Sequence, residues 1–254
     1  MIEIKSLSDT SFEEIFAAFH LAFSDYEIQI NDQQLSAMLK RRGFNPDLSF
    51  AAFVEGRIVA FTLNGIGTYN GKLTAYDTGT GTLKQYRGQG LASKIFEYSI
   101  PFLKKENIEQ YVLEVLQHNS KAVSVYQKLG FEVVREFNYF TAEPDKINLN
   151  SNKSDEFLIS KIDVNIVESL TEFCDFNPSW QNSVESVKRD MTRFEILAVS
   201  VANKIVGYCI FEPKSGDITQ LAVDKNYRRK GVGSVLLAEV SKLNQSNILK
   251  VKSS

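Results

Sequence analysis

A short sequence element occurs twice in this chain, and it constrains the fold more than any other feature. Residues 85–93 spell Gln-Tyr-Arg-Gly-Gln-Gly-Leu-Ala-Ser, and residues 226–234 spell Asn-Tyr-Arg-Arg-Lys-Gly-Val-Gly-Ser. Tyrosine, arginine, the second glycine and serine stay in register between the copies. Each copy follows a strand-like run and precedes an amphipathic helix pattern. Such long-range self-similarity predicts two domains of one kind.

Length and composition agree with that division. A chain of 254 residues fits two domains of about 100 to 150 residues each. Hydrophobic residues make up 43% and charged residues 24%, which supplies enough apolar side chains for ordinary globular cores. A net charge of -2 gives no general attraction to nucleic acid or to an anionic membrane. Any anion that the protein binds must therefore be held by local geometry.

The sequence also predicts the compartment. No apolar run approaches the roughly 20 residues that a membrane span needs, and residues 1–5 have the pattern of a first strand rather than of a signal peptide. Cys174 and Cys209 have no paired spacing, and His20 and His118 are isolated. We therefore expect a cytoplasmic protein without a metal site.

Helix and strand patterns alternate around the first copy. Ser11 and Glu14 form a capping box, and Asn119 and Gly130 are spaced as a helix N-cap and a helix stop. We expect helices at 11–23 and 33–42, a hairpin with strands at 49–54 and 57–64, and a strand at 73–82. Next we expect a helix with Leu91, Ile95, Phe96 and Phe102 on one face, which Pro101 interrupts and bends. A strand at 110–116 follows, then a short helix with Ala122, Tyr126 and Leu129 on its inner face, and closing strands within 131–140.

A polar, turn-rich segment then predicts a linker. We expect a first domain at 1–143, the linker at 144–156 and a second domain at 157–254. The second domain repeats the order with a helix that carries Trp180, Val184, Val187 and Met191, a hairpin across 197–211, a strand at 218–223, a further helix, and the start of another strand at 248–251. No counterpart of residues 119–140 follows, so we expect the second domain to be C-terminally incomplete.

The repeated element has the chemistry of an anion site. A strand, a glycine-rich turn and a helix N-terminus gather unpaired backbone N–H groups at the positive end of the helix dipole. Gly88 and Gly90 keep the backbone accessible and can adopt positive φ, and Arg87 can add a charge-assisted contact. The predicted ligand is a phosphate or pyrophosphate. The alternative is a glycine-rich turn beside a surface arginine.

Other nucleotide and hydrolase motifs do not fit. The triphosphate-binding pattern Gly-x-x-x-x-Gly-Lys-Ser/Thr is absent. A dinucleotide fingerprint at Gly88-x-Gly90-x-x-Ser93 lacks the third glycine or alanine and an acidic residue in its usual place. Neither Gly-x-Ser-x-Gly nor a Cys/His nucleophile signature appears, which argues against a hydrolytic nucleophile.

Two spaced motifs carry a family resemblance. The first is Arg87-x-x-Gly90-x-Ala92, and the second is Asn119-x-x-Ala122-x-x-x-Tyr126-x-x-x-Gly130-Phe131. They resemble the pyrophosphate loop and the second signature of the GNAT superfamily of acyl-CoA-dependent N-acyltransferases. The resemblance covers residues 1–140 well and 155–251 in part. It implies a tandem protein of the mixed α/β class (α+β), with two GNAT-like domains that each hold a central mixed, mostly antiparallel sheet flanked by helices.

The resemblance also implies how acetyl-CoA, as acyl donor, is held. The strand that ends near Thr82 would splay from the strand that ends near Leu116, and acyl-pantetheine would lie between them. Backbone N–H groups at Thr80, Gly81 and Thr82 would hold the pantetheine and polarise the thioester carbonyl, where charge develops during attack. Asn119 would contact the cofactor arm. The pyrophosphate would be held by Arg87, Gly88, Gln89, Gly90, Leu91, Ala92 and Ser93.

The same resemblance makes Tyr126 the general acid that protonates the departing thiolate. A phenol with a pKa near ~10 suits that role, and the alternative is a core tyrosine on an apolar helix face. The attacking amine also needs a proton acceptor, directly or through water. The candidates are Asp77, Glu114 and the pair Asp25 and Glu27, and each can instead be a solvated carboxylate or a turn residue. His118 is expected to be a surface loop residue.

The second copy has only some of these predicted site residues. It keeps Arg228, Gly231 and Gly233, which can still bind a CoA-like anion. It lacks a matching tyrosine and a matching asparagine. We therefore expect a structural or regulatory role for the second domain.

The sequence thus predicts an N-acetyltransferase that moves an acetyl group from acetyl-CoA to a primary amine by direct attack in a ternary complex. Two other classes stay open: a non-catalytic acyl-CoA-binding or sensor module, and an enzyme with another nucleotide-containing cofactor. The acceptor is open among a small amine, an antibiotic, a peptide N-terminus and a lysine. No nucleic acid or membrane partner is expected, and the sequence does not indicate the oligomeric state.

Overall fold

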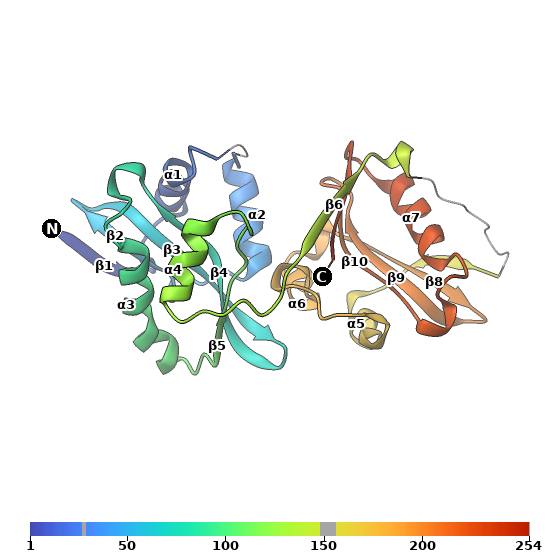
Figure 1. Ribbon diagram of the computed structural model, residues 1–254. Coiled ribbons are helices and arrows are strands. Elements are labelled where there is room, and N and C mark those ends of the chain that lie inside the picture. Colours follow the sequence, from blue (N-terminus) through green and yellow to red (C-terminus); the bar gives the residue numbers. More distant parts are fainter. Residues whose placement is uncertain (27–28, 148–155, 254) are drawn as a thin grey trace. The chain divides into compact units, whose positions relative to one another are not determined.

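The computed structural model describes residues 1–26, 29–147 and 156–253. It divides into two compact units, Met1–Glu132 and Val133–Ser254. Each unit contains one mixed, mostly antiparallel sheet with helices packed on it (Figure 1). The predicted fold class is confirmed. Within the described ranges, no helix is long and apolar enough to cross a membrane.

The first unit has a five-stranded sheet in the order β1-β2-β3-β4-β5. Neighbouring strands are antiparallel except β4 and β5, which are parallel. Its elements are β1 (Ile2–Ser6), α1 (Phe12–Ala22), α2 (Asp32–Arg42), β2 (Phe50–Val54), β3 (Arg57–Tyr69), β4 (Lys72–Thr82), the 3-10 helix η1 (Lys84–Tyr86), α3 (Leu91–Lys105), β5 (Gln110–Val112) and α4 (Ser120–Lys128).

Local side-chain chemistry sets several of these boundaries. The capping box predicted at the start of α1 is present, because Ser11 accepts from the Glu14 N–H while the Glu14 carboxylate accepts from the Ser11 N–H. Asn119 caps α4 by accepting from the Ala122 N–H at 3.2 Å. Gly130 follows α4 with a φ of 89°, a backbone angle that favours glycine.

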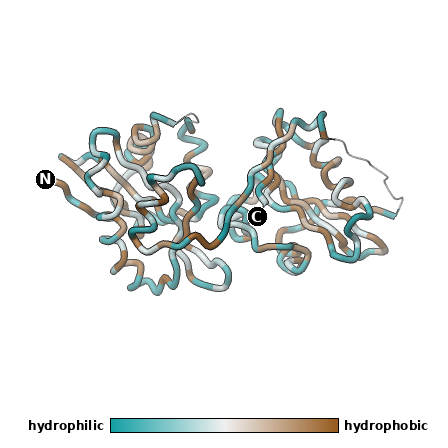
Figure 2. Tube along the Cα trace, in the orientation of Figure 1, coloured by the Kyte–Doolittle hydropathy of each residue, from teal (hydrophilic) through white to brown (hydrophobic). Residues whose placement is uncertain are grey.

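Alternate residues of the central strands supply two hydrophobic layers. One layer joins Ala51, Phe61 and Leu63 to α1 and α2, and the other joins Phe50 and Ala60 to α3. Successive side chains of a strand point to opposite faces, so helices cover both faces of the sheet. Figure 2 shows hydrophobic residues gathered along the strands.

Two predicted details of the first unit are wrong. The strand expected over 110–116 pairs only at Gln110–Val112, where the ladder with β4 stops. Helix α3 continues through Pro101, and Leu103 is buried on its inner face whereas Phe102 is 40% exposed. Leu103 continues the spacing of the buried positions, so Phe102 falls one residue off the core face.

The second unit has a six-stranded sheet in the order β6-β11-β10-β9-β8-β7, with β10 and β11 parallel. Helix α7 covers one face, and α5 and α6 cover the other. Its elements are β6 (Asn138–Ala142), η2 (Pro144–Lys146), β7 (Leu158–Lys161), α5 (Val164–Glu168), η3 (Thr171–Phe173), η4 (Trp180–Asn182), α6 (Val184–Lys188), η5 (Met191–Arg193), β8 (Glu195–Val201), β9 (Lys204–Glu212), β10 (Asp217–Val223), η6 (Lys225–Tyr227), α7 (Val232–Leu243) and β11 (Leu249–Ser253).

Strand β6 does not belong to the sheet for which the sequence predicted it. We expected residues 131–140 to close the first sheet, but β6 pairs antiparallel with β11 in the second, from Asn138 opposite Ser253 to Ala142 opposite Leu249. The compact units accordingly divide after Glu132, earlier than the predicted domain end at residue 143. A paired edge satisfies the backbone groups of β11.

The helix expected to follow Asn177-Pro178 is instead three short helical segments, η4, α6 and η5. Ser183 interrupts it because its backbone is extended, with φ of -67° and ψ of 156°. Its hydroxyl accepts from the Ser186 N–H and so begins a new helix.

We predict that Gly81→Ala destabilises the first domain by about 1–3 kcal/mol. An added Cβ would lie 2.6 Å from the Phe61 ring and 3.0 Å from the Ala22 Cβ, whereas at Gly79 the nearest atom, in Phe19, is 3.4 Å away. Gly79→Ala, the matched control, should stay within about 0.5 kcal/mol of wild type.

Chemical unfolding followed by circular dichroism measures both variants. Trp180, the single tryptophan, lies in the second unit, so its fluorescence should show an unchanged second transition. Equal destabilisation by the two substitutions would contradict the packing argument.

Candidate active site

The first sheet opens along β4. Parallel pairing with β5 covers only Thr74 to Tyr76 of β4, although β4 continues to Thr82. On its other side, the ladder between β4 and β3 skips Thr78, which forms a β-bulge. A bulge leaves one residue unpaired, bends the strand and re-aims its side chains. The expected splay of the two strands is therefore present, and the bulge lies where it begins.

A buried carboxylate lies at this opening. Oδ2 of Asp77 accepts hydrogen bonds from the hydroxyls of Thr80 at 2.7 Å and Tyr126 at 2.9 Å. Asp77 is 8% exposed, and Tyr126 is 49 residues further along the chain, on α4. The fold thus brings the tyrosine that we expected to be the acid into contact with one of the expected proton acceptors.

Burial shifts the ionisation of both groups. Desolvation raises the pKa of Asp77 above its ordinary value, and hydrogen bonds from Thr80 and Tyr126 oppose that rise. The pKa of Tyr126 is also raised, first by burial and then by the adjacent carboxylate. The phenol therefore keeps its proton at physiological pH, which is the form that a general acid requires.

Neighbouring rings hold Tyr126 in place. Phe131 packs edge-on against it, with ring centroids 5.6 Å apart, and also contacts Phe96 and Tyr111. The Tyr111 hydroxyl donates to Asn64 Oδ1 at 2.5 Å. These contacts join α4 to α3, β5 and β3. Sequence reasoning missed Tyr111 and Asn64, because no local motif marks them and only the fold brings them together.

The glycine-rich turn has the backbone geometry expected of an anion site. Gly88 and Gly90 have φ of 80° and 71°, and a Cβ built at either position meets nothing within 4 Å. Gly90 is the N-cap of α3 and supplies no side-chain hydrogen bond. The N-terminus of α3 thus has no capping side chain, and the space beside the two glycines is open near the positive end of the helix dipole.

Arg87 directs its guanidinium back onto the protein. Nε donates to the Thr82 carbonyl at 3.1 Å, Nη1 donates to Asp25 Oδ2 at 2.8 Å, and Nη2 donates to the Ala22 carbonyl at 2.8 Å. Three of the five N–H donors of the guanidinium thus have protein acceptors. A direct contact between this side chain and an anion stays a prediction.

The other expected donor-site residues differ in what they expose. Leu91 is 2% exposed, and Gly81 packs closely against a phenylalanine ring, so only their backbone atoms can face a ligand. Gln89 is exposed, and Ala92 and Ser93 are half-buried in the first turn of α3. The expected contact of Asn119 with the cofactor also stays a prediction, since the structure shows that residue as a helix cap.

The remaining candidate bases have different settings. Asp25 is paired with Arg87, and Glu114 is half-buried in the segment after β5. His118 is exposed, as expected of a surface loop residue. Glu27 lies outside the described residues. Of these candidates, Asp77 accepts a hydrogen bond from the Tyr126 hydroxyl.

The second unit repeats the backbone arrangement. Parallel pairing of β10 with β11 covers only Asp217 and Ile218, although β10 continues to Val223. The ladder with β9 skips Thr219, which forms a bulge at the position equivalent to Thr78. The open sheet is thus a property of the duplicated fold rather than of one copy.

The second turn also keeps its shape. Gly231 caps α7 with a φ of 94° and no side-chain hydrogen bond. Arg229, which replaces Gly88 of the first copy, has a φ of 63°. A residue other than glycine is strained at such an angle, so the loop geometry is maintained at an energetic cost.

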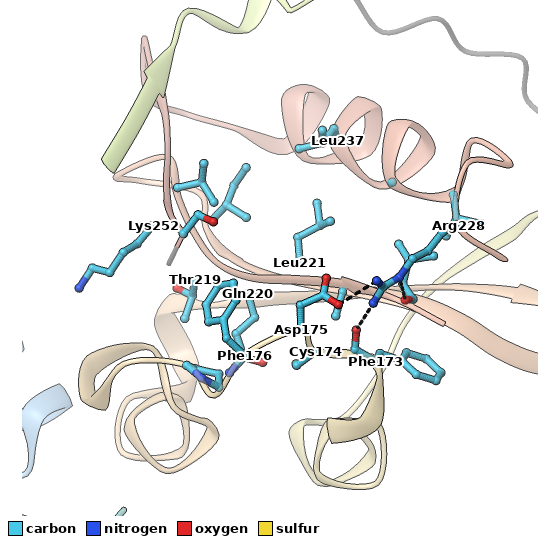
Figure 3. A pocket seen from close by; sticks show the side chains of 18 of the residues that line it. Phe173, Cys174, Asp175, Phe176, Thr219, Gln220, Leu221, Arg228, Leu237 and Lys252 are labelled. Carbon is cyan, nitrogen blue, oxygen red and sulfur yellow. Dashed lines mark hydrogen bonds and ion pairs between the residues drawn. The ribbon is translucent and has the colours of Figure 1, made fainter. Parts of the chain in front are cut away.

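A cavity of about 1020 Å³ lies between β10 and β11 (Figure 3). Arg228, Gly231 and Gly233, the three residues predicted from the second copy, all line it. Thr219 and Lys252 contribute from the two strands. The second unit therefore contains a space of ligand size beside the repeated turn.

Two polar residues of the first site have aliphatic counterparts in the walls of this cavity. In the register of the repeat, Ile218 stands in place of Asp77 and Leu221 in place of Thr80. An aliphatic side chain at each position can neither accept nor donate a proton. The two units thus share a backbone arrangement but differ in the side chains at these two positions.

A polar chain that sequence reasoning missed lies beside the cavity. The Tyr208 hydroxyl donates to Gln220 Oε1 at 2.8 Å, and Gln220 Nε2 donates to the Asn182 carbonyl at 2.7 Å. Cys174 Sγ lies 3.2 Å from the same hydroxyl, so the thiol donates to it. The chain satisfies buried polar groups.

Two family models match the chain, one in each unit. The model described as the acetyltransferase (GNAT) family matches residues 12–131, and the model described as the acetyltransferase (GNAT) domain matches residues 193–253. The chain belongs to the GNAT family. The two copies of the sequence repeat belong to two GNAT domains in tandem.

Curated relatives of this GNAT protein match over part of their length. The N-alpha-acetyltransferase 30 of Schizosaccharomyces pombe is 32% identical over 87 residues, which are 34% of this chain and 58% of that protein. The N-alpha-acetyltransferase 30 of Dictyostelium discoideum is 28% identical over 115 residues, 45% of this chain and 62% of that protein. The matches thus span about three fifths of these relatives.

Solved structures resemble the tandem as a whole. A GCN5-related N-acetyltransferase from Sphaerobacter thermophilus has a TM-score of 0.71 at 12% identity, covering 99% of this chain and 86% of that one. A tandem GNAT protein from the clavulanic acid biosynthesis pathway has a TM-score of 0.68 at 11% identity, covering 100% and 90%. At these identities the likeness establishes the fold.

We predict that Asp77 makes the stability of the first GNAT domain depend on pH. Its pKa is raised in the folded protein, so the folded state holds the proton more tightly than the unfolded state. This contribution is complete below the unfolded pKa of about 4 and is lost as the pH rises through the folded value.

Urea unfolding from about pH 4 to pH 8 tests this sign. The free energy of unfolding of wild type should fall with rising pH relative to that of Asp77→Asn. Glu97→Gln, which removes an exposed carboxylate on α3, is the control. A difference between wild type and Asp77→Asn that stays constant over this range would refute the assignment.

Proposed function

We propose that the first GNAT domain is an N-acetyltransferase that transfers an acetyl group from acetyl-CoA to a primary amine by direct attack in a ternary complex. The hydrogen bond between Tyr126 and Asp77 at the opening of the sheet is the observation that supports this most. It pairs a phenol that stays protonated with a carboxylate at the point where two parallel strands part.

The residues of this domain fit a CoA-type donor. The open space at Gly88 and Gly90 and the uncapped N-terminus of α3 suit pyrophosphate oxygens. Beyond Tyr76, the edge of β4 that β5 leaves unpaired suits the amides of a pantetheine arm. We therefore propose Thr80, Gly81, Thr82, residues 87–93 and Asn119 as the donor site.

The chemistry needs only groups of this domain once acetyl-CoA supplies the activated acyl group. Asp77 accepts the proton that the attacking amine loses, directly or through water. Tyr126 donates its phenolic proton to the sulfur as the carbon–sulfur bond breaks. The hydrogen bond between the two then returns the proton from Asp77 to Tyr126, so both groups regain their starting states. Backbone N–H groups at Thr80 to Thr82 stabilise the charge on the carbonyl oxygen.

We propose the α-amine of a peptide as the acceptor. The matching proteins of Schizosaccharomyces pombe and Dictyostelium discoideum carry the name N-alpha-acetyltransferase, which supports this class of amine. A lysine ε-amine, a small amine and an antibiotic are the other classes against which the proposal is tested.

Loss of the acid should lower turnover rather than donor binding. Tyr126→Phe should reduce kcat by about 10²–10⁴-fold, the range for general acid–base catalysis, with an unchanged Kd for acetyl-CoA. Thiol release across a panel of peptides and small amines measures kcat, and titration calorimetry measures Kd. Tyr98→Phe, on the exposed side of α3, is the matched control.

Two outcomes would contradict the proposal. Full activity of Tyr126→Phe with every accepted amine would remove Tyr126 from the reaction. Acetyl-CoA binding by wild type without thiol release from any amine would instead favour a non-catalytic binding module.

For the second domain we propose a non-catalytic binding site for acyl-CoA. The cavity of about 1020 Å³ at its turn supports a ligand of that size. Arg228, Gly231 and Gly233 line the cavity, whereas Ile218 and Leu221 replace the polar groups of the first domain. Binding without chemistry is the function that this combination favours.

Matched leucine substitutions distinguish the two sites. Gly233→Leu adds a side chain to the lining of the second cavity, and Ala92→Leu is its counterpart in the first domain. Calorimetry should give two CoA molecules per wild-type chain and one for each variant, because either side chain fills the space that the ligand needs. Only Ala92→Leu should lose acetyl transfer.

The number of CoA molecules bound per chain decides whether the second domain has a binding site. One CoA per wild-type chain would contradict a second binding site. Loss of transfer in Gly233→Leu would contradict its non-catalytic role.

A further inference from the structure

The arginine of the repeated turn links two segments that are far apart in sequence. In the first domain Arg87 holds the Thr82 carbonyl at the end of β4, the Ala22 carbonyl in the last turn of α1, and the carboxylate of Asp25. Asp25 lies 62 residues before Arg87, in the loop that follows α1. One side chain thus spans from the anion-binding turn to the loop after α1.

Arg228 makes the same three contacts in the second domain. Nε donates to the Val223 carbonyl at 3.1 Å, Nη1 to Asp175 Oδ1 at 2.8 Å, and Nη2 to the Phe173 carbonyl at 3.0 Å. Figure 3 shows the contacts of Arg228 with Asp175 and Phe173. Each nitrogen has the same type of acceptor as in Arg87. The acceptors have no shared sequence motif, so the arrangement itself is repeated rather than a local sequence.

Only a guanidinium can make this arrangement. Its planar fork directs several N–H groups along fixed directions, whereas an ammonium is a point charge. The cation also lies at the C-terminal end of α1, where the helix dipole favours positive charge. The pair is partly exposed, with 41% of the Arg87 side chain and 43% of the Asp25 side chain accessible. It therefore adds little to the free energy of unfolding, and its main effect is to fix the position of the loop.

In the second domain, the loop held by Arg228 lines the ligand cavity, since Phe173, Asp175 and Phe176 belong to its wall. In the equivalent loop of the first domain, Tyr26 follows Asp25 and packs edge-on against Phe23, with ring centroids 5.1 Å apart. Gln29 fixes the loop from the other side, because its amide donates to the Phe23 and Tyr26 carbonyls at 2.9 Å and 2.7 Å. A shift of Asp25 would therefore shift the neighbouring Tyr26, whose carbonyl Gln29 holds.

We propose that Arg87 and Arg228 are positioning residues, each of which ties the loop on one side of its ligand cleft to the anion-binding turn. We call the three hydrogen bonds of each arginine the clasp; in the first domain they join Arg87 to Thr82, Ala22 and Asp25. A phosphate-bearing ligand at the turn then orders the loop through this clasp. The coupling half of the inference rests on the proposed function, because it assumes a CoA-type phosphate at the turn. The clasp itself is independent of that function.

Amide hydrogen exchange of the full chain, read by mass spectrometry, tests both halves. Without ligand, Asp25→Ala, Arg87→Ala and Arg87→Lys should each raise exchange in the peptide over 20–26 by about tenfold, a typical coupling between linked sites. Lys84→Ala removes a positive charge that lies 3.9 Å from Asp25 but leaves the clasp intact, so it should behave like wild type.

Added CoA tests the coupling. It should protect the peptide over 20–26 in wild type but not in Asp25→Ala, although the Kd of that variant should stay within about threefold of wild type, as expected for loss of an exposed ion pair. Asp175→Ala should have the same effect on the peptide over 170–176. Each peptide reports on its own domain, so two bound CoA molecules do not confuse the readout.

The outcomes separate this inference from the proposed function. Wild-type exchange in Asp25→Ala, or in Arg87→Lys, would overturn the clasp and favour a direct contact of the arginine charge with phosphate. CoA binding to the first domain without loop protection would overturn the coupling alone. Absence of any CoA binding would contradict the proposed function, and the coupling with it, while the ligand-free result would still decide the clasp.

Discussion

Parallel pairing between β4 and β5 stops at Tyr76, although β4 runs on to Thr82, and the candidate site depends on this break. Backbone N–H and C=O groups need hydrogen-bond partners. The edge of β4 that β5 leaves unpaired is therefore available to solvent or to a ligand. The bulge at Thr78 lies at the same point and turns the side chains around it. Asp77 comes directly before the bulge, and Tyr126 meets it from α4. An unpaired strand edge, a buried carboxylate and a phenol thus meet where one hydrogen-bond ladder is interrupted.

Duplication preserved the backbone of this site and changed its side chains. The bulge, the early end of the parallel ladder and the positive φ before the helix recur in the second domain. Ile218 and Leu221 nevertheless replace Asp77 and Thr80, so the second domain keeps a cavity without these two polar side chains. Backbone hydrogen bonding tolerates most side chains, whereas acid–base chemistry requires particular ones. This difference supports our proposal that the chain combines one catalytic domain with one binding domain.

Burying a carboxylate costs free energy unless hydrogen bonds or charges compensate it. Asp77 receives two hydroxyl donors, and the cost appears as a raised pKa. A group so placed is more readily protonated than a surface carboxylate, which suits a proton acceptor that must later release its proton. Arg87 illustrates the opposite case: a charge at the surface, satisfied by three acceptors, whose role is to fix position.

Sequence by itself determined the features that depend on neighbouring residues. The capping box at Ser11, the cap at Asn119 and the repeated turn follow from side chains a few positions apart, and the two-domain GNAT organisation follows from the repeat and its motifs. Only the tertiary structure decided that β6 completes the second sheet, that Arg87 reaches Asp25 rather than open space, and that Asp77 is the carboxylate beside Tyr126. Each of these contacts joins residues dozens of positions apart. The energy of such a contact depends on which strands pair and where a ladder stops, and no local pattern records that.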